Sequence, residues 1–291
     1  MNPDYSKLDE TLKYKALELE SWFKKYSKVL VAFSGGVDSS LLAYFAKLTL
    51  GDNSAALTLS NPTYADYELK EAEDIAKFIG IKHIVIKYDS LEDINPKIAE
   101  NPSNRCYFCR SDLVKELKKV KEREGFDVLV AGTLLDDLSD YRPGLIALRE
   151  GDVKAPLIEV GLRKDEVRAL AKALGLPNHD KPSNSCLASR IPFGEKITEE
   201  KLLKIAQAEL IISKITGAKK VRVRYHGKDI ARIEVDRHER KLFFNEQVMD
   251  DVYNKLKALG FKYVTLDLRG YRASGIENLS IRVKNTWYER A

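Results

Sequence analysis

The sequence predicts an α/β protein with a parallel sheet, followed by a smaller α+β domain. Two observations predict the first part. Apolar runs of strand length alternate with helical patterns, and a polar glycine loop joins the first such strand to a helix. A third observation predicts the second part: beyond residue 193 the alternation gives way to a hairpin pattern. We therefore expect two domains, residues 1–193 and 194–291.

The first domain follows element by element from these patterns. An opening helix precedes a buried strand, and helical stretches then separate further strands, as in βαβ units. In chain order we expect a helix at 7–26, a strand at 28–33, a helix through 41–48, a strand at 54–59, a helix at 64–79, a strand at 83–88, a helix at 106–124 and a strand at 127–131. Ligands of such sheets bind at the carboxyl ends of the strands.

The rest of the chain changes character. A helix within residues 163–177, with Gly and Pro stop signals, leads into a loop region at 178–193. Thr198 suits the N-cap of a helix that runs to Thr216. Two alternating strands around a His-Gly-Lys-Asp turn then predict a hairpin. These strands occupy 221–235, and a helix at 242–259 and a strand in KYVTLDLRGY follow.

Composition limits the classes of protein. Apolar residues make up 44% and charged residues 32% of a 33.0 kDa chain, as in globular proteins. The longest apolar runs fall far short of the roughly 20 residues of a membrane span. The polar N-terminus lacks a secretory signal, so we expect a cytoplasmic protein without a membrane partner. A net charge of +5 is too mild to indicate nucleic-acid binding, although it suits anionic ligands.

SGGVDSS, residues 34–40, is the most specific signal. Gly35 and Gly36 let the backbone approach a ligand, and the helix that follows presents unpaired N–H groups and a partial positive charge. Ser34, Ser39 and Ser40 can donate hydroxyls to phosphate, and Asp38 can orient the loop or help to hold a metal ion. The pattern is neither a Walker P-loop nor a dinucleotide fingerprint. The plain alternative is a glycine turn without a ligand.

A strand, SGGxDS and a helix resemble the PP-loop of the ATP pyrophosphatases, a superfamily with an adenine nucleotide alpha hydrolase-like fold. The resemblance implies that the loop binds the pyrophosphate of ATP with Mg²⁺, Asp38 being a candidate Mg²⁺ ligand. It also implies that a substrate oxygen is adenylylated and pyrophosphate is released.

Further stretches resemble the LarE family of sulfur transferases, and the resemblance covers nearly the whole chain. They are NRCYFCR (104–110), GTLLDDLSDYRPG (132–144), SNSCLASRIPFG (183–194), VRVRYHG (221–227) and LRGYR (268–272). The family implies conversion of a carboxylate of pyridinium-3,5-biscarboxylic acid mononucleotide to a thiocarboxylate. The product is a precursor of the nickel-pincer nucleotide cofactor. A small-molecule nucleotide substrate, a sulfide source and homo-oligomers are implied as well.

The chain has only three cysteines, Cys106, Cys109 and Cys186. Taken alone, the CxxC pair is compatible with a zinc half-site, a redox pair or two small buried residues. One LarE branch sacrifices the sulfur of the CLASR cysteine, whereas the other binds a 4Fe-4S cluster through three cysteines, and this sequence resembles the second. Three thiolate ligands leave one iron open, where a sulfide can sit. A sacrificial Cys186 remains the alternative.

Four more residues are site candidates. Asp137, beside Asp136 after a strand end, suits Mg²⁺ and phosphate chemistry; a solvated acidic turn is the alternative. Arg222 and Arg224 alternate with valines, so both lie on one strand face, where two guanidiniums suit a phosphate. The family uses arginines of this motif for the substrate phosphate. Arg190 of CLASR could also hold phosphate. Surface ion pairs and a solvated strand are the plain alternatives for these arginines.

The expected function is therefore ATP-dependent sulfur transfer from a 4Fe-4S cluster. A tRNA thiolase is the rival enzyme, but the modest charge does not favour RNA. An amide-forming synthetase of the NAD synthetase type needs no thiols. A nucleotide or iron–sulfur scaffold without catalysis would keep the same residues and release no pyrophosphate. The smaller domain is expected to contribute to phosphate binding and oligomerisation.

Overall fold

The structure, a computed structural model, describes residue 5 and residues 8–139, 142–182 and 185–271. The chain forms two compact units. The first comprises the residues up to Cys186 together with Lys196–Glu199, and the second comprises Leu187–Glu195 and the residues from Glu200 onward. The chain passes from the first unit to the second at residue 187, returns to the first at 196–199 and continues in the second from residue 200. The predicted boundary at residue 193 lies within this stretch.

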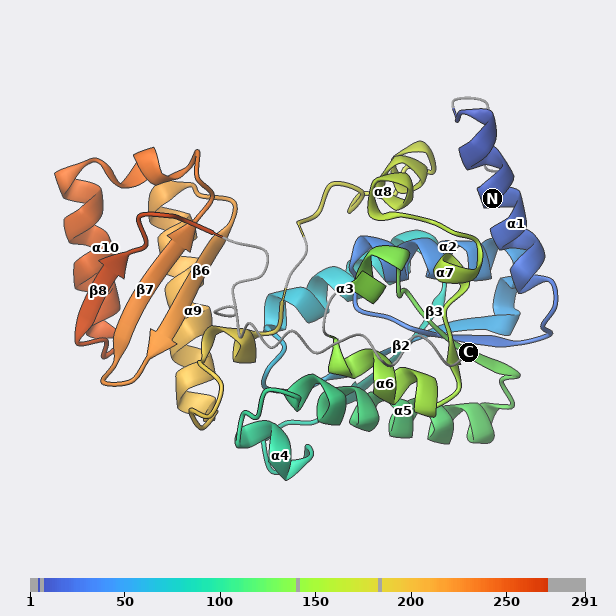
Figure 1. Cartoon of the computed structure of the whole chain (residues 1–291), viewed down its shortest axis with the longest axis horizontal. Coiled ribbons are helices and arrows are strands. Elements are labelled where there is room, and N and C mark those ends of the chain that lie inside the picture. Colours follow the sequence, from blue (N-terminus) through green and yellow to red (C-terminus); the bar gives the residue numbers. More distant parts are fainter. Residues whose placement is uncertain (1–4, 6–7, 140–141, 183–184, 272–291) are drawn as a thin grey trace. The chain divides into compact units, whose positions relative to one another are not determined.

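The first unit holds a five-stranded, all-parallel sheet in the order β3-β2-β1-β4-β5 (Figure 1). The strands are β1 (Val29–Ala32), β2 (Ser54–Ser60), β3 (Lys82–Lys87), β4 (Val128–Ala131) and β5 (Val153–Lys154). The chain moves outward from β1 to β3 and then returns to the other side of β1. The strand order therefore reverses between β1 and β4. We call this place the switch point, and open α/β sheets bind their ligands there.

Helices cover both faces of this sheet. They are α1 (Glu10–Phe23), α2 (Val37–Leu50), α3 (Asp66–Ile79), α4 (Pro96–Ala99), α5 (Arg105–Glu124), α6 (Pro143–Glu150), α7 (Pro156–Glu159) and α8 (Lys164–Ala173), with short 3₁₀ turns η1 (Gly51–Asn53) and η2 (Leu135–Ser139). Alternate residues of β1 enter different cores. Val29 and Val31 pack with α1, α2, α3 and α8, whereas Leu30 packs with α5. The period-2 alternation of a strand accounts for this division.

The second unit is a small three-stranded sheet in the order β6-β7-β8, with two helices. Its elements are η3 (Leu187–Arg190), α9 (Glu199–Thr216), β6 (Val221–His226), β7 (Ile230–Val235), η4 (Arg240–Phe243), α10 (Glu246–Ala258) and β8 (Tyr263–Leu266). The predicted hairpin is present: β6 and β7 are antiparallel, and Lys228 and Asp229 in the turn both have positive φ. β8 runs parallel to β7 after the α10 crossover.

The predicted fold class, a parallel sheet domain followed by a smaller α+β domain, is confirmed. Differences concern element ends and short elements. The first helix begins at Glu10 because the Asp9 carboxylate caps it, accepting from Leu12 N at 2.8 Å. Likewise α10 begins at Glu246 because Asn245 caps it. The sequence patterns did not predict α6 or the two-residue β5.

Candidate functional site

The loop after β1 packs closely against α3. Gly35 has φ +66°, and a Cβ at this position would lie 2.8 Å from the Cα of Ala72. A side chain is excluded twice, by conformation and by space. The hydroxyl of Tyr64 donates to the Ser34 carbonyl at 2.7 Å and holds the loop at its start. A glycine-rich loop is thus fixed between the end of β1 and the beginning of α2.

The serines close the loop on itself. The Ser39 hydroxyl donates to the Gly36 carbonyl at 3.1 Å and accepts from Ser34 N at 3.2 Å. Gly36 is the N-cap of α2 and supplies no side-chain cap, so the first turn of this 14-residue helix keeps uncapped N–H groups. Such a helix start favours phosphate oxygens through its N–H donors and its dipole.

Asp38, in the first turn of α2, is paired with a residue that the sequence reasoning missed. Lys164 Nζ, at the start of α8, donates to both carboxylate oxygens of Asp38 at 2.7 Å. Burial raises the pKa of Asp38, and the adjacent Lys164 opposes that shift. The charge of Asp137 adds to the rise, which places the Asp137 carboxylate near Asp38.

Asn178 is a second residue that the sequence did not single out. Its buried side-chain amide donates to the Gly35 carbonyl and to the Ser40 hydroxyl, both at 2.9 Å. The Asn178 Oδ1 atom is buried without a hydrogen-bond partner among the described residues. Asn178 therefore fixes the loop and α2 from a segment about 140 positions further along the chain.

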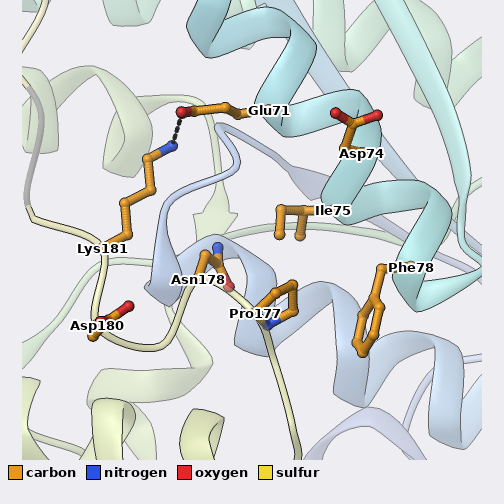
Figure 2. Close-up of a pocket in the computed structure, with 8 residues that line it drawn as sticks. All are labelled: Glu71, Asp74, Ile75, Phe78, Pro177, Asn178, Asp180 and Lys181. Carbon is orange, nitrogen blue, oxygen red and sulfur yellow. Dashed lines mark ion pairs between the residues drawn. The ribbon is translucent and has the colours of Figure 1, made fainter.

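Asn178 also lines a hollow of about 540 Å³ beside the loop. Figure 2 shows that one wall comes from α3 and the other from the segment after α8, and that Lys181 points to Glu71. The Lys181 Nζ to Glu71 carboxylate distance is 2.6 Å. This ion pair joins the two walls and holds the segment that carries Asn178.

The second loop at the switch point follows β4. A Cβ on Gly132 would lie 2.8 Å from Ser39 N and 2.9 Å from the Asp38 carbonyl carbon. The loop after β4 therefore lies in direct backbone contact with the first turn of α2. The Asp137 carboxylate accepts from Leu134 N at 3.0 Å and pairs with Arg142 at 2.6 Å. The neighbouring Asp136 carboxylate accepts from Lys164 N at 2.9 Å.

The three cysteines belong to the first unit. Cys106 and Cys109 lie in the first turns of α5, and Cys186 is the last residue of the main segment of this unit. Crowding by protein atoms raises the pKa of the Cys106 thiol although the residue is exposed, and burial raises the pKa of Cys109 to about 12. A charged Cys186 thiolate adds to the rise in the pKa of both Cys106 and Cys109.

Basic residues and a glycine surround the cysteine pair. Arg105, Arg110 and Arg142 lower the pKa of Cys106 and partly offset the rise. A Cβ on Gly144, at the start of α6, would lie 3.3 Å from the Cys106 carbonyl oxygen. The α6 start thus packs directly on the cysteine turn, which gives the RPG part of the 132–144 motif a structural role.

Within the described ranges, no three His, Cys, Asp or Glu side chains lie at metal-binding distances from one another. The donor chemistry nevertheless suits an iron–sulfur cluster, because all three candidates are cysteines, whose thiolates are the usual ligands of such clusters. The 4Fe-4S cluster and the Mg²⁺ site at Asp38 both stay predictions.

The three candidate phosphate arginines lie together in the second unit. Arg190 is 2% exposed and forms two bonds to the Glu209 carboxylate of α9, at 2.9 and 3.1 Å. Arg222 lies 3.9 Å from the same carboxylate, and Arg224 is 3.0 Å from Glu234 of β7. Three guanidiniums thus share two buried carboxylates, so much of their positive charge is neutralised.

Comparison with known proteins assigns the chain to a family. A family model described as NAD synthase matches residues 14–184. A pyridinium-3,5-bisthiocarboxylic acid mononucleotide synthase of Lactiplantibacillus plantarum is 35% identical over 266 residues, 90% of this chain and 94% of the relative. The chain belongs to the LarE family. The predicted resemblance is confirmed.

Two further relatives frame the match. An uncharacterized protein of Synechocystis sp. is 38% identical over 268 residues, 92% of this chain and 98% of the relative. A tRNA-specific 2-thiouridylase of Azorhizobium caulinodans is 30% identical over 206 residues, 58% of this chain and 52% of the relative. LarE proteins are sulfurtransferase-type enzymes of the ATP pyrophosphatase superfamily, and the predicted enzyme class is confirmed.

The LarE chain brings most of its predicted ATP residues together. Ser34, Gly35, Gly36, Asp38, Ser39 and Ser40 form the loop and first turn, and Asp137 lies close by. Lys164, Asn178 and Gly132 are the residues that sequence reasoning missed. A glycine directly after a buried strand and a lysine opening a helix were the available signals.

No helix in the described part of the chain is long and apolar enough to cross a membrane.

Proposed function

We propose that this LarE protein uses ATP to adenylylate a carboxylate of a pyridinium dicarboxylate mononucleotide, and that sulfur then replaces AMP. In the first step the carboxylate oxygen attacks the α-phosphorus of ATP and pyrophosphate leaves. In the second step sulfide attacks the acyl carbon with its own electron pair, the bond from the acyl carbon to the AMP oxygen breaks, and AMP leaves with the bonding pair. Sulfur enters and stays at the sulfide level and phosphorus and carbon keep their oxidation states, so neither step needs an oxidant or a reductant.

The loop residues account for the first step. Gly35 and Gly36 bring backbone N–H groups close to the pyrophosphate, and the start of α2 adds its uncapped donors. The hydroxyl groups of Ser34, Ser39 and Ser40 can donate hydrogen bonds to ATP. For Ser39 such a bond would replace those that it forms within the loop, to the Gly36 carbonyl and from Ser34 N. Lys164 and Asp38 lie at the same place. The Lys164 ammonium group can exchange its ion pair with Asp38 for one with a phosphate oxygen of ATP. Asp38 and Asp137 are candidate Mg²⁺ ligands.

The cysteines account for the second step. We propose that Cys106, Cys109 and Cys186 hold a 4Fe-4S cluster; when bound, the cluster supplies the sulfur. In the absence of a cluster the raised pKa values of Cys106 and Cys109 keep these thiols protonated at neutral pH. The same unit contains the ATP loop and the three thiols. That co-location, in a chain that matches a bisthiocarboxylate synthase along 90% of its length, is the observation that carries the proposal.

The substrate phosphate is assigned to the second unit. Arg190, Arg222 and Arg224 remain the candidates from the sequence, and they lie around two buried carboxylates, Glu209 and Glu234. A tRNA thiolase is the second candidate function because a 2-thiouridylase matches 58% of the chain. The longer match to the mononucleotide synthase favours the small-molecule substrate.

The test uses anaerobically purified protein with ATP and the pyridinium dicarboxylate mononucleotide. We expect release of pyrophosphate and formation of a thiocarboxylate, and we expect Cys109→Ala to bind less iron and form little thiocarboxylate. The same variant should still release pyrophosphate, because its ATP loop is intact. If the parent releases no pyrophosphate with this substrate, the proposed function is wrong. Iron binding by Cys109→Ala equal to that of the parent contradicts the three-thiol site.

A further inference from the structure

The peptide bond between Gly35 and Gly36 has its two polar groups on opposite sides of the loop. No peptide bond in the described residues is cis, so the Gly35 carbonyl and the Gly36 N–H point in opposite directions. The carbonyl accepts from the buried Asn178 at 2.9 Å, whereas Gly36 N lies 3.4 Å from the hydroxyl of the exposed Ser34. The carbonyl therefore faces the interior, and the N–H faces the open side of the loop.

The N–H on the open side is available to a ligand. Its contact with the Ser34 hydroxyl, at 3.4 Å, is longer than an ordinary hydrogen bond. Gly36 is also the N-cap of α2, so this N–H adds to the uncapped N–H groups of the first helical turn. An anion on the open side can therefore replace Ser34 as the partner of the Gly36 N–H.

Asn178 holds the carbonyl side of this peptide. Its side-chain nitrogen donates to the Gly35 carbonyl and to the Ser40 hydroxyl, and Figure 2 shows this nitrogen on the side away from Pro177. If the amide were turned round, its oxygen would face the Gly35 carbonyl oxygen, and neither atom can donate. The carbonyl that Asn178 binds thus fixes the direction of the amide.

The segment that carries Asn178 is anchored on both sides. Leu176 is fully buried, and its N–H donates to the Ala171 carbonyl of α8 at 2.9 Å. Lys181 N donates to the Asn178 carbonyl at 3.1 Å, and Arg168 of α8 donates to the Lys181 carbonyl at 2.9 Å. Because the backbone before and after Asn178 is tied to α8, its amide cannot follow a rotation of the loop peptide.

The two glycines leave the opposite orientation of the peptide accessible. Turning the peptide over would point the Gly35 carbonyl outward and would bring φ of Gly36 from −77° to a positive value, which glycine tolerates. The observed φ of Gly36 suits any residue, and a Cβ there would lie 3.4 Å from the Ser34 hydroxyl oxygen. Glycine at position 36 is therefore needed by the turned peptide rather than by the observed one.

We propose that Asn178 is a positioning residue for the pyrophosphate of ATP: it holds the Gly35–Gly36 peptide with the N–H outward, the orientation that accepts an anion. The identity of the anion rests on the proposed function, whereas the orientation rests on the bonds of the loop. Without the Asn178 donor, the Gly35 carbonyl would be buried without a partner, and turning outward to water would relieve it. An acceptor would then replace a donor where the phosphate oxygens bind.

The experiment measures binding of inorganic pyrophosphate to the full chain by calorimetry, and the shift of the Gly36 amide signal by NMR of protein with isotope-labelled glycine. Asn178→Leu keeps the branched shape of asparagine without its donor. We expect pyrophosphate to bind this variant about tenfold more weakly than the parent, since a charge-assisted hydrogen bond is lost, and to shift the Gly36 signal much less. Asn245→Ala is the matched control, because it loses the N-cap bond to Val248 N in the second unit and should bind pyrophosphate like the parent.

Thermal unfolding of each variant shows whether the fold is retained, and Asn178→Ala gives the same comparison if Asn178→Leu does not fold. Parent-like affinity of the folded Asn178 variant, or a parent-like shift of its Gly36 signal, overturns the proposal. A parent that binds no pyrophosphate refutes the role of the loop in the proposed function, and this proposal with it. Pyrophosphate binding that depends on Asn178, in a protein that forms no thiocarboxylate, supports the positioning role and refutes only the proposed function.

Discussion

Gly132 directly follows β4 and lies beside the first turn of α2, and the absence of a side chain lets the two backbone segments come into contact. The same holds for Gly35 against α3. These two glycines allow the close approach of the backbone segments on either side of the switch point, before any ligand is bound. Asn178 then satisfies the Gly35 carbonyl and the Ser40 hydroxyl, which would otherwise be buried without a donor.

Gly132→Ala tests this contact. The added methyl would meet Ser39 N and the Asp38 carbonyl carbon at under 3.0 Å, and backbone atoms cannot turn aside as a flexible side chain can. We expect a loss of about 1–3 kcal/mol in the free energy of unfolding and a weaker affinity for ATP. Denaturant unfolding and ATP titration measure both. Gly227→Ala is the control, because a Cβ there has no neighbour within 4 Å. An ATP affinity equal to the parent's would contradict the close-contact account.

His83 makes a prediction about pH. The Thr58 hydroxyl donates to the Phe33 carbonyl at 3.0 Å, so its oxygen accepts from His83 Nε2 at 2.7 Å. Burial lowers the pKa of His83 below its ordinary value of 6.5. A lowered folded pKa means that the stabilisation is present above pH 6.5 and is lost as pH falls through the folded value.

We therefore expect the parent to lose stability relative to His83→Gln as pH falls from about 7 to 5, because the variant has no proton to take up at this position. Denaturant unfolding at several pH values measures the difference. His238→Gln, at an exposed position, is the matched control. A constant difference between parent and His83→Gln over this range would sink the prediction.

At the scale of elements, α9 holds the second unit together through one carboxylate. Glu209 receives Arg190 of η3 and also accepts from Val223 N of β6 at 3.0 Å. A helix, a 3₁₀ turn and a strand thus meet at a single buried side chain. Removing one partner of such a pair leaves the other charge uncompensated, which costs more than the pair itself contributes.

Glu209→Leu should lower the free energy of unfolding by about 3–5 kcal/mol, because Arg190 would stay buried without its carboxylate. Glu200→Leu on the same helix is the control. Glu200 is 81% exposed and pairs only loosely with Lys204, so its loss should cost less than about 1 kcal/mol. Denaturant unfolding compares the two variants. Equal losses would show that the buried network adds nothing to stability.

At the scale of the whole molecule, the predicted ATP loop belongs to one unit and the buried arginines Arg190, Arg222 and Arg224 belong to the other. Ligand binding stabilises the part of a protein that makes the contacts. Saturating ATP should therefore slow amide hydrogen exchange in β1 and α2 and leave β6, β7 and β8 unchanged. Mass spectrometry of peptides from the full chain measures this. Equal protection in both units would mean that they open as one cooperative structure.

The sequence could predict what is encoded locally. The alternation of strands and helices identified the parallel sheet, and SGGVDSS identified the loop after β1. Asn178 and Lys164 could not be found this way, because each acts on a loop more than 120 positions away and only the fold brings them there. The pairing of Arg222 and Arg224 with carboxylates was hidden for the same reason. The strand β5 could not be predicted from the sequence, because two residues are too few to show a periodic pattern.

The bond from Glu209 to Val223 N has a consequence for association between chains. Among the strands of the described residues, β6 lies at one edge of its sheet, and exposed edges offer free backbone groups on which a strand from another molecule can add. At β6 this donor is already occupied, and two inward-pointing arginines make the edge still less suitable. The other edge, β8, has an exposed tyrosine at Tyr263. Any sheet that continues from one copy of the second unit into another would therefore do so through β8.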